Sequence, residues 1–120
     1  MCYKPHMPRK NSLSTTPPAA VEAMVVRLGA NLRAARLARN LTVAEMAEKI
    51  GTGRRAVMDA ESGKPGTSIA VYAALLWAHN LAGPFADLAD PAADTEGLAR
   101  VHGERNRASG SGKGKLDNDF

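Results

Sequence analysis

Arg54 and Arg55 stand side by side at the start of a segment with helical periodicity, directly after the turn-forming residues Gly51-Thr-Gly53. The planar guanidinium group of arginine donates two parallel hydrogen bonds, which match the O6 and N7 acceptors of guanine in the major groove of DNA. Such a contact discriminates against a wrong base by about 1–3 kcal/mol. The alternative role for both side chains is a contact with phosphate or water, which carries no sequence information. The pair therefore indicates a nucleic-acid contact.

Two short amphipathic helices are predicted to position this arginine pair. Thr42 can cap the first helix, and Glu45 stands three residues further on, which is the spacing of a capping box. Gly51 permits the chain reversal that a β-carbon would obstruct. The second helix keeps Val57 and Ala60 on its inner face, so its outer face consists of Arg54, Arg55, Met58 and Asp59. Two helices joined by a three-residue glycine turn form a helix-turn-helix, whose second helix suits the major groove.

Over residues 28–81 the sequence resembles, without gaps, the helix-turn-helix family of phage lambda-type repressors, known as XRE regulators. The motifs that carry the resemblance are Leu41-Thr42, Ala47-Glu-Lys-Ile-Gly-Thr52, Val57 and Glu61-Ser-Gly-Lys64. The resemblance implies an all-α DNA-binding domain of five to six helices with flexible N- and C-terminal tails. It also implies a transcriptional repressor that binds double-stranded operator DNA, and a homodimer would double the few base pairs that one helix reads. The residues expected to bind DNA are Arg39, Thr42, Val43, Gly53, Arg54, Arg55, Met58, Asp59 and Lys64.

Three positions depart from the family pattern. Val43 stands where the family commonly has glutamine, and Gly53 replaces the usual serine or threonine before the recognition helix. Asp59 is acidic in the middle of the expected reading face. These departures are the best support for a less favoured alternative of another class, a protein-only adaptor whose helix-turn-helix no longer binds DNA.

The charged residues around the motif have distinct expected roles. The family counterpart of Arg36 pairs with the glutamate that corresponds to Glu61, so the resemblance implies a structural ion pair between these two side chains. Asp59 can accept a hydrogen bond from cytosine or pair with Arg55 four residues earlier, and the second role is favoured. Two further cations, Lys64 and Arg39, are expected to contact phosphate, with a solvated surface as the alternative.

Proline and glycine residues divide the remaining chain. We expect a disordered tail (1–17), a DNA-binding domain (18–90), a C-terminal helix (91–107) and a flexible tail (108–120). Helix 18–39 is expected to carry Gly29 as a tolerated weak spot, and its apolar face is expected to contain Val21, Val25, Leu28, Leu32 and Leu37. A later helix carries Ile69, Tyr72, Leu75, Leu76 and His79, and Trp77 and Tyr72 are expected to pack in the ordinary way. The residues left over by the small core, and so expected at the dimer surface, are Leu81, Pro84, Phe85 and Leu88.

The charge is unevenly distributed along the sequence. Residues 1–64 hold 11 Lys and Arg against 5 Asp and Glu, whereas residues 65–99 hold 4 acids and no Lys or Arg. Residues 100–120 hold 5 basic and 3 acidic residues. A basic half suits a phosphate backbone, which releases counterions when it is neutralised. The acidic half suits a protein contact, with a solvated acidic face as the alternative.

Other chemistry is not indicated. The single cysteine, Cys2, excludes an internal disulfide and suggests a reducing compartment. The three histidines are remote from one another and from Cys2, so neither a metal site nor another cofactor is expected. No phosphate-binding loop, nucleophile motif or carboxylate pair points to an enzyme. No apolar run approaches the roughly 20 residues that span a bilayer, and no signal region begins the chain, so we expect a cytoplasmic protein.

The last five residues, Leu116-Asp-Asn-Asp-Phe120, follow a Gly/Ser/Lys linker. Leu116 and Phe120 could anchor this end in a hydrophobic pocket of a partner. The chain looks similar to the HipB class, antitoxins that repress their own operon and bind a HipA-type kinase toxin. The resemblance implies this antitoxin role, and the alternative is a stand-alone autorepressor of phage or stress type.

Overall fold

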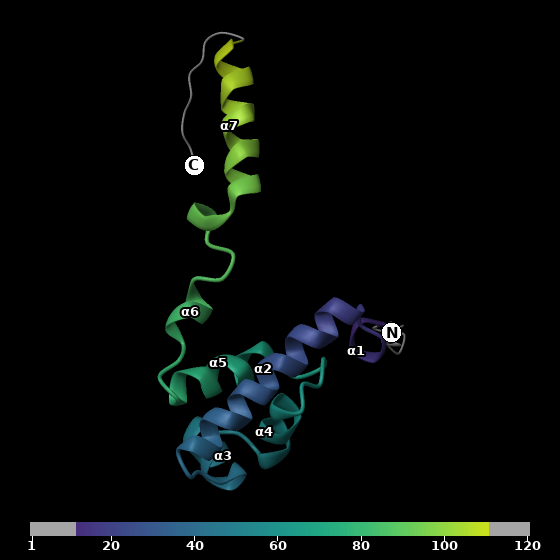
Figure 1. Cartoon of the computed structure of the whole chain (residues 1–120), viewed down its shortest axis with the longest axis vertical. Helices are drawn as coiled ribbons and strands as arrows, with labels where there is room; N and C mark the ends of the chain where they lie inside the picture. Colours follow the sequence, from purple (N-terminus) through teal and green to yellow (C-terminus); the bar gives the residue numbers. More distant parts are fainter. Residues whose placement is uncertain (1–11, 111–120) are drawn as a thin grey trace, which may run out of the picture. The chain divides into compact units, whose positions relative to one another are not determined.

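The computed structural model describes residues 12–110, and its regular elements within that range are all helical (Figure 1). The elements are α1 (Ser12–Thr15), α2 (Ala19–Ala38), α3 (Val43–Ile50), α4 (Arg54–Glu61), α5 (Ile69–Ala78), α6 (Gly83–Ala86), the 3-10 helix η1 (Pro91–Ala93) and α7 (Thr95–Gly110). This confirms the predicted all-α class, although short helices raise the number beyond five or six. The chain forms two compact units, the first ending at Phe85 and the second beginning at Ala86. None of the helices between residues 12 and 110 is both long and apolar enough to cross a membrane.

The core of the first unit lies between α2, α3, α4 and α5 (Figure 1). α4 packs against α2, α3 and α5, so the second helix of the motif is held from three sides. Burial of each large apolar side chain contributes about 1.5–3 kcal/mol relative to exposure. The buried core residues are Leu32, Met46, Ala47, Val57, Ala60, Tyr72, Leu75 and Leu76.

Gly29 marks the point at which the backbones of α2 and α4 touch. A β-carbon at this position would lie 2.4 Å from the carbonyl oxygen of Ala60 and 2.7 Å from that of Glu61. Gly29 itself is buried. The expectation that it is only a tolerated weak spot of its helix is therefore wrong, because the missing side chain is what permits this helix crossing.

Several apolar side chains are more exposed than the sequence pattern predicted. Leu37 is 48% exposed on α2, and Ile69 is 71% exposed on α5. Trp77 was expected to pack but is 65% exposed, because it lies on the side of α5 opposite the core. Phe85, expected at a free surface, is half-buried and packs against the core cluster. The expected dimer surface is thus partly used by the core of the first unit itself.

Both ends of the described chain differ from the predicted boundaries. α1 lies within the segment that was expected to be a disordered tail. The single helix predicted for residues 91–107 is instead η1 followed by α7, which extends to Gly110. Two aspartates set this break: the Asp90 carboxylate accepts a hydrogen bond from the Ala92 N–H, and Asp94 accepts one from the Gly97 N–H. The remainder of both expected tails lies outside the described residues.

His79 ends α5 and is 2% exposed, with neither ring nitrogen hydrogen-bonded. Burial lowers the pKa of His79 below its ordinary value of 6.5, since it disfavours the charged imidazolium. The positive charges of Arg39, which follows α2, of Lys49 on α3 and of Arg36 on α2 lower the pKa further, whereas Glu61 on α4 opposes the shift. The folded state therefore keeps this ring neutral at pH values at which the unfolded chain already binds a proton.

We expect the first unit to lose stability on acidification below about pH 6.5. At these pH values His79 binds a proton in the unfolded chain but stays neutral in the folded state. The free energy of unfolding should be level above that pH and fall by up to about 1.4 kcal/mol per pH unit below it. His79→Leu should flatten this dependence, whereas the exposed control His102→Gln should retain it. Urea midpoints between pH 5 and 7.5 measure the effect. An unchanged slope in His79→Leu would show that another group causes the pH dependence of stability.

Candidate DNA-binding surface

The first helix of the motif, α3, begins with the capping box that the sequence predicted. The Thr42 hydroxyl accepts a hydrogen bond from the Glu45 N–H at 3.0 Å, and the Glu45 carboxylate accepts one from the Thr42 N–H at 2.8 Å. These two bonds satisfy donors that a helix N-terminus otherwise leaves open. The cap therefore fixes where α3 starts and holds Val43 at its first position.

The turn between the two helices also follows the prediction. Gly51 ends α3 with a φ of +79°, in the left-handed region that residues with a β-carbon rarely adopt. Gly53 caps α4 in an extended conformation but provides no side-chain hydrogen bond. The N–H groups in the first turn of α4 are therefore left without a side-chain cap and suit contacts with water or an anion.

α4 presents the arginine pair on its free face. Val57 and Ala60 are fully buried and attach the helix to the core. Arg54 and Arg55 are exposed, and Met58 is 46% exposed. The predicted division between an inner and an outer face is confirmed for these residues, so the guanidinium groups are accessible to a large ligand.

Asp59 belongs to a small charge cluster on this face. Its Oδ1 atom lies 3.9 Å from Nη1 of Arg55 and 3.4 Å from Nζ of Lys64. The pair with Arg55 is the favoured intrahelical arrangement. The pair with Lys64 was not predicted, because residues five apart do not share a helix face. It arises because the chain folds back after α4, where the Lys64 N–H donates to the Asp59 carbonyl. Both cations are largely exposed, so these pairs are weak.

Arg36 and Glu61 form the expected ion pair beneath the motif. The Arg36 Nε and Nη2 atoms donate to the two carboxylate oxygens of Glu61 at 2.8 and 2.9 Å. Nη1 donates to the Leu41 carbonyl at 2.8 Å. The hydrogen bond to Glu61 raises the pKa of Arg36 above its ordinary value. One buried guanidinium thus ties α2 to the start of the motif and to the end of α4.

An open hollow of about 330 Å³ brings together two candidate residues from different helices. Val43 contributes from α3 and Met58 from α4, and both present apolar groups. The same hollow is lined by Arg33, Arg36, Glu61 and Ser62. The valine that replaces the family's common glutamine therefore lies beside the exposed methionine of the recognition helix.

Other candidate residues lie apart from this cluster. Arg39 uses two guanidinium donors within the protein, one to the Ala35 carbonyl at 2.9 Å and one to the His79 carbonyl at 3.0 Å. It thereby joins the C-terminal ends of α2 and α5, where a cation is favourable. Its expected phosphate contact stays a prediction. Leu116 and Phe120, expected to bind a partner, lie outside the described residues.

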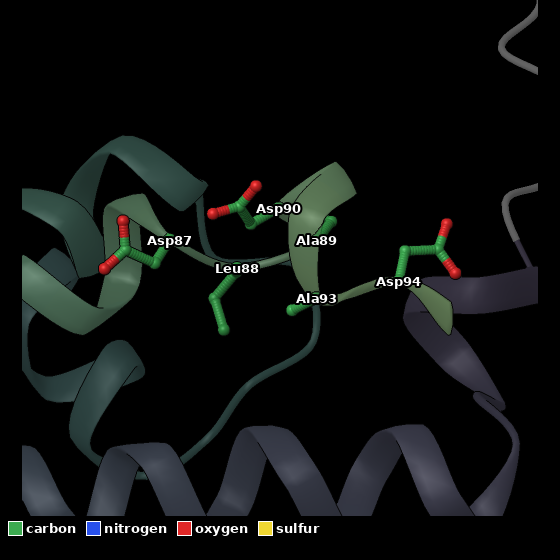
Figure 2. Close-up of a pocket in the computed structure, with 6 residues that line it drawn as sticks. All are labelled: Asp87, Leu88, Ala89, Asp90, Ala93 and Asp94. Atoms are coloured by element: carbon green, nitrogen blue, oxygen red, sulfur yellow. The ribbon is translucent and has the colours of Figure 1, made fainter. Parts of the chain in front are cut away.

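The second unit contains an acidic hollow of about 460 Å³ (Figure 2). Figure 2 shows Asp87, Asp90 and Asp94 around it, together with Leu88, Ala89 and Ala93. The three carboxylates would repel a phosphate backbone. Among the described residues, no group of three or more histidine, cysteine or carboxylate side chains is arranged to hold a metal ion. The acidic lining of this hollow does not suit a DNA contact.

Comparison with protein families agrees with the geometry of α3 and α4. Residues 27–89, just over half of the chain, match the family model of the helix-turn-helix domain. The chain belongs to the helix-turn-helix domain family. The matched segment contains both helices of the motif, whereas all of α7 lies beyond it. No curated protein and no solved structure is significantly similar to the chain.

Membership of the helix-turn-helix family indicates a DNA-binding regulator. In helix-turn-helix proteins the second helix of the motif enters the major groove, and here that helix is α4. The exposed face with Arg54 and Arg55 is therefore the candidate DNA-binding surface.

Proposed function

We propose that this protein is a transcriptional repressor that binds operator DNA sequence-specifically as a homodimer. The observation that supports this most is the exposed arginine pair on the free face of α4, the second helix of the motif. Repression follows from occupancy, because a protein seated in the major groove over a promoter excludes polymerase. Two copies would read two half-sites about one helical turn apart, which gives the specificity that one short helix lacks.

The candidate residues then divide into two roles. Arg54 and Arg55 would donate to base edges, and Arg54 is free to do so because it forms no ion pair within residues 12–110. Arg55 needs only to leave a weak pair at 3.9 Å. Lys64 and the first-turn N–H groups of α4 would bind phosphate, which sets the orientation of the helix. Met58 and Val43 would provide apolar contacts, for which the thymine methyl group is the matching feature.

The arginine pair gives a direct test of this assignment. Arg54→Ala or Arg55→Ala should weaken binding to the selected operator by about 1–3 kcal/mol, and binding to random duplex DNA much less. The physical reason is that a lost base contact removes discrimination, whereas a lost phosphate contact weakens all duplexes alike. Operators selected from a randomised duplex pool and titrated by fluorescence anisotropy at fixed salt measure both affinities.

Arg27→Ala serves as the matched control, because Arg27 is an exposed arginine of α2 outside the motif. It should change neither affinity by more than the general effect of one positive charge. Equal losses on operator and random DNA for the Arg54 and Arg55 variants would restrict these arginines to phosphate contacts. Failure to enrich any sequence would instead support the adaptor alternative.

As a second candidate, we propose that the repressor also acts as the antitoxin of a HipA-type kinase toxin. The acidic segment with Asp87, Asp90 and Asp94 favours a protein partner, because it would be repelled by DNA and its apolar Leu88 is 68% exposed. Leu116 and Phe120 remain the predicted anchors of such a contact. Copurification followed by mass spectrometry tests this role, and recovery of the chain without a kinase-type partner leaves the stand-alone repressor.

A further inference from the structure

α5 is apolar around its entire circumference but is covered by its own unit on one side only. Its ten residues, Ile-Ala-Val-Tyr-Ala-Ala-Leu-Leu-Trp-Ala, include no charged side chain. Tyr72, Leu75 and Leu76 face the core and are buried. A helix that is apolar on all sides is normally buried on all sides. The outer side of α5 is therefore a surface without its expected cover.

The outer side consists of residues three or four apart in the sequence, which form one continuous face of the helix. We term this face the α5 stripe; its residues are Ile69, Ala70, Ala73, Ala74 and Trp77. Its two large members are 71% and 65% exposed, the highest values for large apolar side chains between residues 12 and 85. Between them stand only alanines, whose short side chains let another helix come close. Exposed apolar patches of this kind mark interaction sites in soluble proteins.

The charge around the α5 stripe narrows the choice of partner. Residues 65–86 contain no Asp, Glu, Lys or Arg, whereas residues 1–64 are strongly basic. Without cations the stripe cannot attract DNA, and without any charge it offers no complementarity to a charged protein surface. A second copy of the chain is different, because in a two-fold symmetric pair the same neutral patch of each copy faces the other. Two basic units can meet at a neutral stripe without like-charge repulsion.

We infer that the α5 stripe binds the α5 stripe of a second copy of this chain, as an antiparallel, two-fold symmetric helix pair. Ile69 and Trp77 are eight residues apart, about 12 Å along the helix. In an antiparallel pair Trp77 of one copy packs against Ile69 of the other, and the alanines meet at the centre. This inference rests on the proposed function, because pairing matters through the two half-sites that a dimer reads. The α5 stripe replaces the dimer surface expected at Leu81, Pro84, Phe85 and Leu88.

The test measures self-association of the full chain by sedimentation equilibrium. Trp77→Glu and Ile69→Glu should each raise the dimer dissociation constant at least about 30-fold, as expected for central anchors of an interface. Met24→Glu is the matched control, because Met24 is 64% exposed on α2 and lies outside the stripe. This control should associate like the unaltered chain. Circular dichroism confirms that each variant remains helical.

Trp77 is the only tryptophan of the chain, so the unaltered protein provides a second readout. Its fluorescence should shift to longer wavelength and become more accessible to acrylamide on dilution, because dissociation returns the indole to water. A protein that stays monomeric, or a dimer that both stripe variants leave intact, would overturn the inference. Binding of selected half-site DNA by such a monomer would show that sequence-specific DNA binding by α4 survives this failure, without the homodimer.

Discussion

Replacing Gly29 with alanine is expected to lower the free energy of unfolding of the first unit by about 3 kcal/mol or more, at or above the top of the usual range for overpacking a core. Alanine favours helices over glycine by about 0.8–1.0 kcal/mol, so helix propensity alone predicts the opposite sign. The steric term dominates because the new carbon would meet backbone oxygens of Ala60 and Glu61, at 2.4 and 2.7 Å. Backbone atoms cannot move aside by changing a rotamer, so α2 and α4 must separate.

Urea titration followed by circular dichroism measures this loss. Gly103→Ala is the control, because a β-carbon at Gly103 of α7 meets no atom within 4 Å. That change should leave the transition of the first unit unaltered. A Gly29→Ala protein as stable as the unaltered chain would show that the two helices are not held at this distance.

The second large effect is expected at Arg36. Arg36→Met should cost about 3–5 kcal/mol, because it leaves the buried Glu61 carboxylate without its partner. The Leu41 carbonyl also loses its hydrogen bond, so the link between α2 and the start of the motif is removed. The loss appears as a lower urea midpoint, and operator affinity should fall with it because α4 is anchored through Glu61.

The double variant Arg36→Met with Glu61→Leu is the control for this interpretation. It removes both charges together, so it should recover much of the stability. An unchanged melting temperature in the single variant would mean that the pair contributes nothing. A double variant as unstable as the single one would attribute the loss to the Leu41 contact instead.

Local signals made the motif predictable from the sequence. The capping box depends only on Thr42 and Glu45, which are three residues apart. The turn at Gly51 depends only on the backbone conformation that glycine itself permits. The inner positions of α4, Val57 and Ala60, follow from helical periodicity. The Arg36–Glu61 pair came from family resemblance, since no spacing rule connects residues 25 apart. All of these features were found where they were expected.

Features that depend on how elements meet could not be predicted in this way. Gly29 has the same sequence signature whether it faces solvent or the backbone of another helix. Trp77 was assigned to ordinary packing because no basic residues accompany the aromatic side chains of this helix. The actual exposure of Trp77 could not be predicted, because α5 is apolar on every side and so lacks the periodicity that identifies a buried face. The pair between Lys64 and Asp59 depends on a turn that reverses the chain after α4.

In α4, the residues that hold the helix in the fold are different from the residues that are free to contact a ligand. Val57 and Ala60 attach it to the core, while Arg54, Arg55 and Met58 are exposed and Arg55 forms no more than a weak ion pair with Asp59. Exchanges at such surface positions typically change stability by only about 0.5 kcal/mol. Mutation can therefore sample new side chains on this face while the domain stays folded. The product of a duplicated gene could therefore acquire a different target sequence through a few substitutions on this face, while the fold is retained.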